Sequence, residues 1–220
     1  MEVNNTIQPY ESIHLKGETI YLLPEKALYW PAKNLLLIAD LHLGKATHFR
    51  KNGMAVPPQA ANQNWKKLHQ LFRLHQPKRV CFLGDLFHST HNKEWTVFGE
   101  LIESYPQIQF ELVVGNHDIL ETSAYEALGF SVFQESKVEG PFILTHEPLE
   151  NSELYNLCGH LHPGVKLNGK GKQRLRAACY YFGETQGILP AFGSFTGLAQ
   201  IPIKENDQVF VVVEGQVIPM

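Results

Sequence analysis

The chain has 220 residues, of which 44% are hydrophobic and 19% charged, with 13 prolines and 17 glycines. This composition is that of an ordinary globular protein and excludes a disordered or fibrous chain. The net charge of −3 excludes a strongly basic or acidic protein. The N-terminus lacks a basic region followed by an apolar one, and no apolar stretch approaches the ~18 residues that span a bilayer. We therefore expect one folded domain over residues 1–220, located in the cytoplasm, with no membrane contact.

Five short apolar runs, each ending in a polar cluster, form the framework of the predicted fold. They are residues 34–42, 79–87, 110–118, 142–148 and 154–162. Such runs are typical of strands buried on both faces. Helical periodicity predicts helices over residues 59–76, from Trp95 to about Tyr105, and over 122–128. Alternating strands and helices predict parallel βαβ units, whose strand ends gather at one edge of a sheet.

The two ends of the chain differ from this middle part. Residues 13–30, 174–197 and 207–219 read as strands joined by turns, without intervening helices. We expect the two ends to form a second, antiparallel sheet. The three cysteines have no zinc-finger spacing and are expected to be reduced core thiols.

Polar side chains that can ligate metals follow nearly every apolar run. Alternation along a strand turns residues i and i+2 to the same side, so that neighbouring pairs can converge. Carboxylates and imidazoles without a thiol suit Mn²⁺, Fe or Zn²⁺ better than a structural zinc site. Seven ligands are too many for one ion and sufficient for two, if one carboxylate bridges them. The candidates are Asp40, His42, Asp85, Asn116, His146, His160 and His162, and glycines precede three of the clusters, at positions 84, 115 and 159.

The order of these motifs is that of a known family. The series D-x-H (40–42), G-D (84–85), G-N-H-D (115–118), a histidine at 146 and G-H-x-H (159–162) resembles the calcineurin-like metallophosphoesterases. This resemblance implies an α+β fold, a four-layer αββα sandwich with two mixed β-sheets flanked by helices. The segments 39–57, 84–88, 159–164 and 189–197 resemble more closely the bacterial ligase-associated DNA-damage-response phosphoesterases of the PdeM type.

The resemblance also implies a role for each candidate. One ion would be held by Asp40, His42, Asp85 and His162, and the other by Asp85, Asn116, His146 and His160, with Asp85 as the bridge. His117 would donate a proton to the leaving oxygen, and Asp118 would orient it. The cofactors are expected to be two divalent ions, with Mn²⁺ favoured over Fe, Zn²⁺ or Mg²⁺. Leu41, Leu43 and Leu161, which lie between ligands, are expected in the core.

The implied activity is that of a phosphodiesterase or endonuclease acting on DNA during repair, with DNA ligase and helicase as partners. A hydroxide bridging the two ions would attack phosphorus. Charge distribution supports a nucleic acid substrate, because residues 44–79 hold eight Lys or Arg and no acid, and residues 166–176 are also basic. The candidate substrate residues are Lys45, Arg50 and His88, whereas Lys66 and Lys67 are better explained as a solvated helix face.

Two alternatives remain open. The substrate could be a small phosphodiester or a nucleotide instead of a nucleic acid. The openness of the site would decide between these substrates, and the sequence does not show it. The chain could also be a non-catalytic scaffold with the same fold, although a scaffold is expected to have lost ligands or His117, and all of them are present. The oligomeric state is open, with a homodimer as one option.

Overall fold

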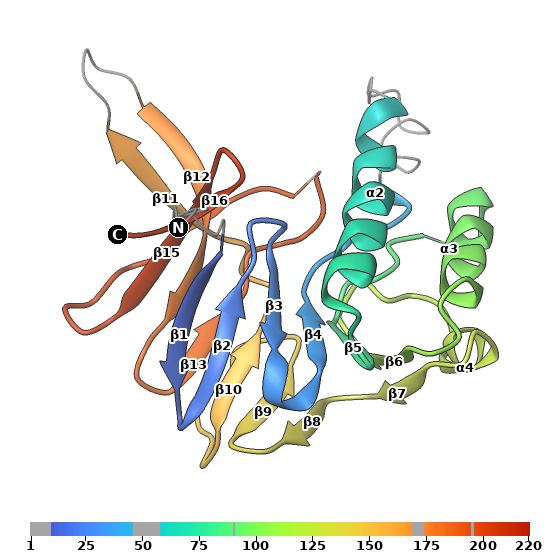
Figure 1. Cartoon of the computed structure of the whole chain (residues 1–220), viewed down its shortest axis with the longest axis horizontal. Coiled ribbons are helices and arrows are strands. Elements are labelled where there is room, and N and C mark those ends of the chain that lie inside the picture. The colour runs from blue at the N-terminus through green and yellow to red at the C-terminus, as the bar shows by residue number, and fades with distance from the viewer. Residues whose placement is uncertain (1–9, 46–57, 90, 169–173, 195) are drawn as a thin grey trace, which may run out of the picture.

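The computed structural model describes residues 10–45, 58–89, 91–168, 174–194 and 196–220. In this part of the chain the strands form two sheets (Figure 1). The first sheet has the order β1 to β7: Glu11–Leu15, Glu18–Leu22, Ala27–Trp30, Leu35–Ile38, Arg79–Leu83, Gln109–Val113 and Ser131–Phe133. The strands β1 to β4 pair antiparallel and β4 to β7 pair parallel, so the sheet is mixed.

The second sheet contains the rest of the described strands. They are β8 Ser136–Glu139, β9 Phe142–Thr145, β10 Tyr155–Cys158, β11 Pro163–Asn168, β12 Arg174–Phe182, β13 Gln186–Ile188, β14 Ala199–Gln200, β15 Gln208–Val213 and β16 Gln216–Pro219. The order is β14-β11-β12-β13-β10-β9-β8, and β15 pairs with β12 and β16. Since β9, β10 and β13 run parallel and most others antiparallel, this sheet is also mixed.

In the described part of the chain, three helices pack on the outer face of the first sheet. They are α2 Pro58–His75, α3 Lys93–Glu103 and α4 Thr122–Ala127, and a short 3₁₀ helix, η1 Pro31–Lys33, links β3 to β4. The helix α3 begins where the side chain of Asn92 accepts hydrogen bonds from two backbone amides. Its buried face, with Trp95 and Phe98, joins a core cluster that includes Leu68 and Phe72 of α2. No described helix is long and apolar enough to cross a membrane.

The two sheets pack against each other through a second apolar cluster. Leu35 and Leu37 of β4 contribute to this layer from the first sheet, and Phe142 and Leu157 contribute from the second. A third cluster covers the other face of the second sheet, where Ile201 from the segment after β14 joins strand residues. The predicted fold, with two mixed sheets and helices, is therefore confirmed, and in the described part of the chain the helices lie on the first sheet.

One detail of the prediction is wrong. The N-terminal strands do not join the C-terminal ones, because β3 pairs antiparallel with β4 directly after the short η1 connection, and this adds β1 to β3 to the first sheet. The five apolar runs are also divided between the sheets, with β4, β5 and β6 in the first and β9 and β10 in the second. The polar clusters consequently face each other across the two sheets.

Candidate metal centre

Main-chain hydrogen bonds tie the loop after β4 to the loop after β5, and the loop after β9 to the loop after β10. The amide of His42 donates to the carbonyl of Asp85 at 2.8 Å, and the amide of Asp40 donates to the carbonyl of Gly84 at 3.3 Å. The amide of Gly159 donates to the carbonyl of His146 at 3.0 Å, which links the loops after β9 and β10. Main-chain hydrogen bonds thus join the polar clusters in two pairs, one on each sheet.

The backbone of these loops lies in the left-handed region at the candidate ligands. Five of the ten described non-glycine residues with positive φ are candidates, with φ values of 48 to 65°: Asp40, His42, Asp85, His160 and His162. This conformation costs a side-chain-bearing residue on the order of 1 kcal/mol or more. Strain of this kind persists where the surrounding structure enforces it, and it gathers here at the convergent polar groups.

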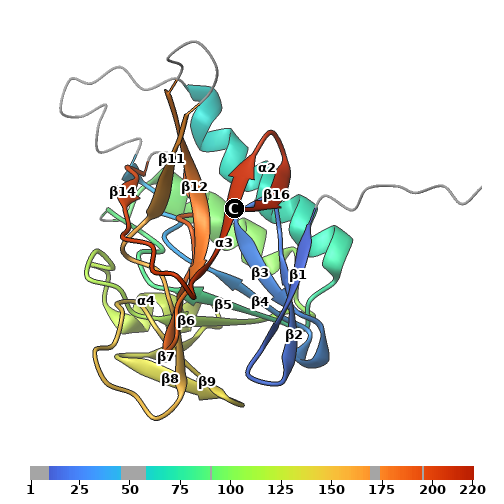
Figure 2. The same cartoon turned by 90° about the vertical axis from the view of Figure 1, so that its left-hand side faces the viewer.

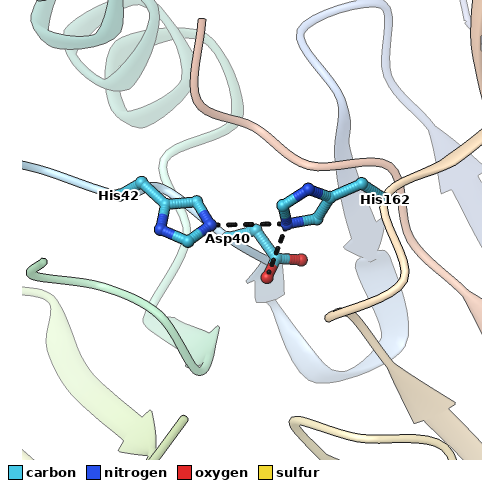
Figure 3. Close-up of side chains that lie close together, drawn as sticks. All are labelled: Asp40, His42 and His162. Carbon is cyan, nitrogen blue, oxygen red and sulfur yellow. Dashed lines mark hydrogen bonds and ion pairs between the residues drawn. The ribbon is translucent and has the colours of Figure 1, made fainter. Parts of the chain in front are cut away.

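Asp40, His42 and His162 form a first group of facing ligand atoms (Figure 3). The two imidazole Nε2 atoms lie 3.3 Å apart, and Nε2 of His162 lies 3.2 Å from Oδ1 of Asp40. This Oδ1 atom is buried and accepts no hydrogen bond, which is costly for a carboxylate without compensation. A cation bound among the three side chains would compensate the buried charge of this oxygen, so the donor set fits a divalent metal ion.

Asp40, Asp85 and His146 form a second group, in which the ligand atoms lie within 4.8 Å of one another. Nε2 of His146 lies 3.4 Å from Oδ1 of Asp85 and 2.9 Å from Oδ1 of Asn116. Nδ1 of His160 lies 3.1 Å from the same His146 nitrogen. All seven predicted ligands are therefore in contact with one or both groups.

Asp85 lies between the two groups. Its Oδ2 is 3.5 Å from Nε2 of His42 in the first group, while its Oδ1 faces His146 in the second. Asp40 also belongs to both groups. Asp85 and Asp40 are therefore the two carboxylates that contact ligand atoms of both groups, and the bridging role of Asp85 stays a prediction.

Neighbouring groups fix the orientation of the His146 ring and the charge of the His42 ring. Nδ1 of His146 lies 2.9 Å from the carbonyl oxygen of Leu83, which leaves Nε2 directed at the cluster. Burial, followed by the positive charge of Lys45, lowers the pKa of His42 to about 2, so this ring is neutral and able to ligate a metal. Burial also lowers the pKa of Lys45, against the opposing effect of Asp85 and Asp40. The Lys45 ammonium therefore interacts electrostatically with both carboxylates.

His117 lies at the exposed rim of the cluster. Its backbone amide donates to Oδ1 of Asp85 at 2.9 Å, and its ring centroid lies 4.3 Å from that of His88 and 5.9 Å from that of His42. A substrate can reach this side chain without entering the protein. Among the predicted substrate residues, Lys45 and His88 are beside the cluster, and Arg50 is outside the described residues.

Asp118 makes contacts that the prediction did not include. Its carboxylate accepts hydrogen bonds from the amides of Leu86, Phe87 and Gly115 at 2.8 to 3.0 Å, and from the hydroxyl of Tyr125 at 3.2 Å. None of these bonds involves the His117 ring. Burial raises the pKa of Asp118 against these hydrogen bonds. In this geometry Asp118 joins the loops after β5 and β6, and its predicted role in orienting His117 stays a prediction.

The segment after β13 also contributes to the centre, and no role was predicted for it. The amide of Gly193 donates to the carbonyl of Asp40 at 3.1 Å, and a Cβ on Gly193 would lie 2.6 Å from the carbonyl oxygen of Leu41. Only a glycine permits this close approach. Gly193, the first glycine of "LPAFGSFTG", was the feature of the sequence that could have indicated this close approach. Leu161, expected in the core, is 38% exposed because its loop lies at the rim, whereas Leu41 and Leu43 are buried.

Solved structures similar to this chain include a nuclease. Pseudomonas putida nuclease MPE matches with a TM-score of 0.79 and 27% identity, over 96% of this chain and 100% of that one. YfcE, a phosphoesterase from E. coli, matches with a TM-score of 0.42 and 16% identity, over 82% and 88% of the two chains. Zinc-complexed Vps29 from Entamoeba histolytica matches with a TM-score of 0.36 and 15% identity, over 84% and 96%.

No curated protein matches the sequence significantly. Residues 33–183, which contain every candidate ligand, match the calcineurin-like phosphoesterase family. This match covers more than half of the chain and includes the strands β4 to β12 that surround the carboxylate and imidazole groups. The chain belongs to the calcineurin-like phosphoesterase family.

Proposed function

We propose that the protein is a phosphodiesterase that cleaves DNA and uses two divalent ions, Mn²⁺ by preference. The observation that carries this proposal is the pair of overlapping ligand groups, which share Asp40 and have one oxygen of Asp85 facing each. His42 and His162 would complete one site, and His146, His160 and Asn116 the other. Bound there, divalent cations supply positive charge that attracts phosphate and lowers the pKa of water.

The side chains around the cluster account for the remaining steps of hydrolysis. The Lys45 ammonium, which interacts electrostatically with Asp85 and Asp40, adds positive charge that favours an approaching phosphate. When water adds to phosphorus and the bond to the leaving oxygen breaks, that oxygen needs a proton. His117, at the exposed rim and with its amide on Asp85, is placed to donate it, a contribution of about 10²–10⁴-fold.

A nucleic acid substrate is supported by the name of the Pseudomonas putida match, a nuclease that is matched over its whole length. The uneven distribution of lysine and arginine supports it further. The DNA-repair context, DNA ligase and helicase as partners, and membership of the PdeM type are part of the proposal and rest on resemblance alone.

The test compares substrates under defined metal conditions. Metal-free protein is supplied with Mn²⁺, Mg²⁺ or Zn²⁺ and assayed on bis(p-nitrophenyl) phosphate, p-nitrophenyl phosphate, and labelled single-stranded and duplex DNA. We expect diester and DNA cleavage that requires metal and is lost in Asp85→Asn. His91→Ala is the matched control, because the His91 ring packs on Trp95, outside the ligand groups. No turnover with any metal would favour a scaffold, and turnover of small diesters alone would favour the small-substrate alternative.

His117→Ala separates proton donation from metal binding. A p-nitrophenolate leaving group is stable without a proton, whereas the sugar oxygen of DNA is not. We therefore expect DNA cleavage to fall by about 10²-fold or more while bis(p-nitrophenyl) phosphate is still hydrolysed. Equal losses on both substrates would mean that His117 is not the proton donor.

A further inference from the structure

The β11–β12 hairpin carries a row of positive side chains on one face. β11 begins at Pro163, directly after the candidate ligand His162, and the hairpin projects away from the body of the two sheets (Figures 1 and 2). The strand register places Lys166 directly opposite Arg176. Arg174 lies two residues from Arg176 and therefore on the same face.

The other face of the hairpin is fixed to the protein. Val165, Ala177 and Cys179 are buried in the third apolar cluster, and Leu167 packs against it. Since successive residues of a strand point to opposite sides, burial of this apolar face directs the basic face to solvent. Lys166, Arg174 and Arg176 are indeed exposed. The hairpin cannot turn its basic face away without exposing part of the core.

Lys166 and Arg176, which lie opposite each other, carry a positive charge that no described acidic side chain neutralises through an ion pair. Like charges directly opposite each other on antiparallel strands are destabilising. No described acidic residue forms an ion pair with Lys166, Arg174 or Arg176. An anion bound between the two side chains would remove the repulsion.

A small cavity lies at this pair. Its volume is about 180 Å³, and it is lined by Lys166 and Arg176 together with Gly164, Val165, Leu198 and Gln200. Gly164 is needed for its shape, because a Cβ at this position would lie 2.9 Å from Cβ of Leu198. The cavity combines two cationic side chains with an amide, a set that suits the oxygens of a phosphate group.

We propose that Lys166 and Arg176 bind a backbone phosphate of a nucleic acid strand, other than the phosphate that is cleaved. Lys166 is four residues from His162 along a strand, or roughly 13 Å at a strand's rise per residue. A small phosphodiester at the metal centre does not extend that far, whereas a strand of several nucleotides does. This inference rests on the proposed function and gives the site a preference for polymers over small diesters.

The test uses the double variant Lys166→Gln/Arg176→Gln, which removes both charges and keeps most of the side-chain length. The control, Lys33→Gln/Lys78→Gln, removes two exposed lysines near the starts of β4 and β5, at the opposite ends of the strands from the ligand loops. Binding of a labelled 20-nucleotide single strand is measured without metal as a function of salt. KM and kcat are then measured with Mn²⁺ for that strand and for bis(p-nitrophenyl) phosphate.

We expect the hairpin variant to bind the strand about tenfold more weakly or worse, with its salt slope reduced by about 0.7 because one phosphate contact is lost. The KM for the strand should rise in parallel, while turnover of the small diester changes less than twofold. The control should retain the affinity and slope of the unmodified protein. The proposal would be overturned by a hairpin variant that binds the strand as tightly as the control does. It would also be overturned by a variant whose turnover of the strand and of the small diester falls equally.

The binding assay also separates this inference from the proposed function. It needs no metal and no turnover, so weakened binding in an inactive protein would support the phosphate subsite and refute the phosphodiesterase. If the unmodified protein is active and the hairpin variant binds the strand with unchanged affinity, only the phosphate subsite is refuted. The melting temperature of the variant should equal or exceed that of the unmodified protein, because the like-charge repulsion is removed.

Discussion

Gly159 lies directly against the carboxylate of Asp40. A Cβ on Gly159 would stand 2.5 Å from Oδ2 of Asp40 and 2.7 Å from Cβ of Ala39. The next amide in the chain, that of His160, donates to the same Oδ2 at 2.9 Å. Because Asp40 belongs to both ligand groups, this contact makes the loop after β10 a support for the whole candidate metal centre.

Gly159→Ala should therefore weaken metal binding. The added methyl group cannot fit unless the Asp40 carboxylate or the β10 loop moves, and supports of metal ligands are typically worth about 10–100-fold in metal affinity. Calorimetric titration of metal-free protein with Mn²⁺ measures the change. Gly197→Ala is the control, since a Cβ at Gly197 meets nothing within 4 Å. Equal Mn²⁺ affinity in both variants would show that the carboxylate does not depend on this contact.

The position of the metal centre was predictable from sequence, but the reason given for it was only partly right. Alternation along a strand was expected to bring Asp40 and His42 together, yet β4 ends at Ile38 and both residues lie beyond it. Their left-handed backbone, with φ of 54° and 49°, and hydrogen bonds to the β5 loop produce the convergence. A one-dimensional pattern indicates that polar groups follow strands, and it cannot specify the turn that directs them.

Contacts between distant segments were the least predictable part. The hydroxyl of Tyr125, on α4, donates to Asp118, and the amide of Gly193 donates to the carbonyl of Asp40. Neither pairing has a signature in local sequence, because each depends on how two separate segments pack. The addition of β1 to β3 to the first sheet was missed for the same reason, since their turns and spacing are compatible with either sheet.

Asp118→Asn tests whether Asp118 supports the loops or only the His117 ring. The amide side chain keeps the shape but replaces one acceptor oxygen with a donor, facing amides that also donate. We expect a loss of about 1–3 kcal/mol in the free energy of unfolding, measured in urea, and reduced turnover of both DNA and small diesters. A variant with unchanged stability and the same substrate-selective defect as His117→Ala would instead support the orienting role.

Metal removal should lower thermal stability. The buried Oδ1 of Asp40, which accepts no hydrogen bond, and the facing imidazoles of His42 and His162 are compensated by a bound cation. Mn²⁺ at 100 times its dissociation constant would add about 2.7 kcal/mol, or roughly 5–10 °C in Tm for a domain of this size. Differential scanning calorimetry with chelator and with Mn²⁺ measures the shift. It should vanish in Asp85→Asn and persist in His91→Ala, and a shift of equal size in both would place the stabilising ion elsewhere.

Lys26 is a partly buried charge outside the ligand groups, and it makes stability depend on alkaline pH. Burial, and then the charge of Lys67 on α2, lower its pKa from 10.5 to about 8. Below pH 8 both the folded and the unfolded chain hold this proton, so the full cost of the buried charge is present. Between pH 8 and 10.5 the folded protein releases the proton first, and its stability rises relative to a chain without this charge.

Lys26→Met should consequently stabilise the protein at neutral pH. Methionine occupies a similar space without the charge, and its effect on the left-handed backbone at this position, with φ of 71°, is the same as that of lysine. We expect a gain of about 1–3 kcal/mol in the free energy of unfolding at pH 7, which shrinks towards zero as the pH approaches 10.5. Urea unfolding across this range measures it, with the exposed Lys78→Met as control. A gain that stays constant with pH would come from apolar packing and would show that the Lys26 charge costs the folded state nothing.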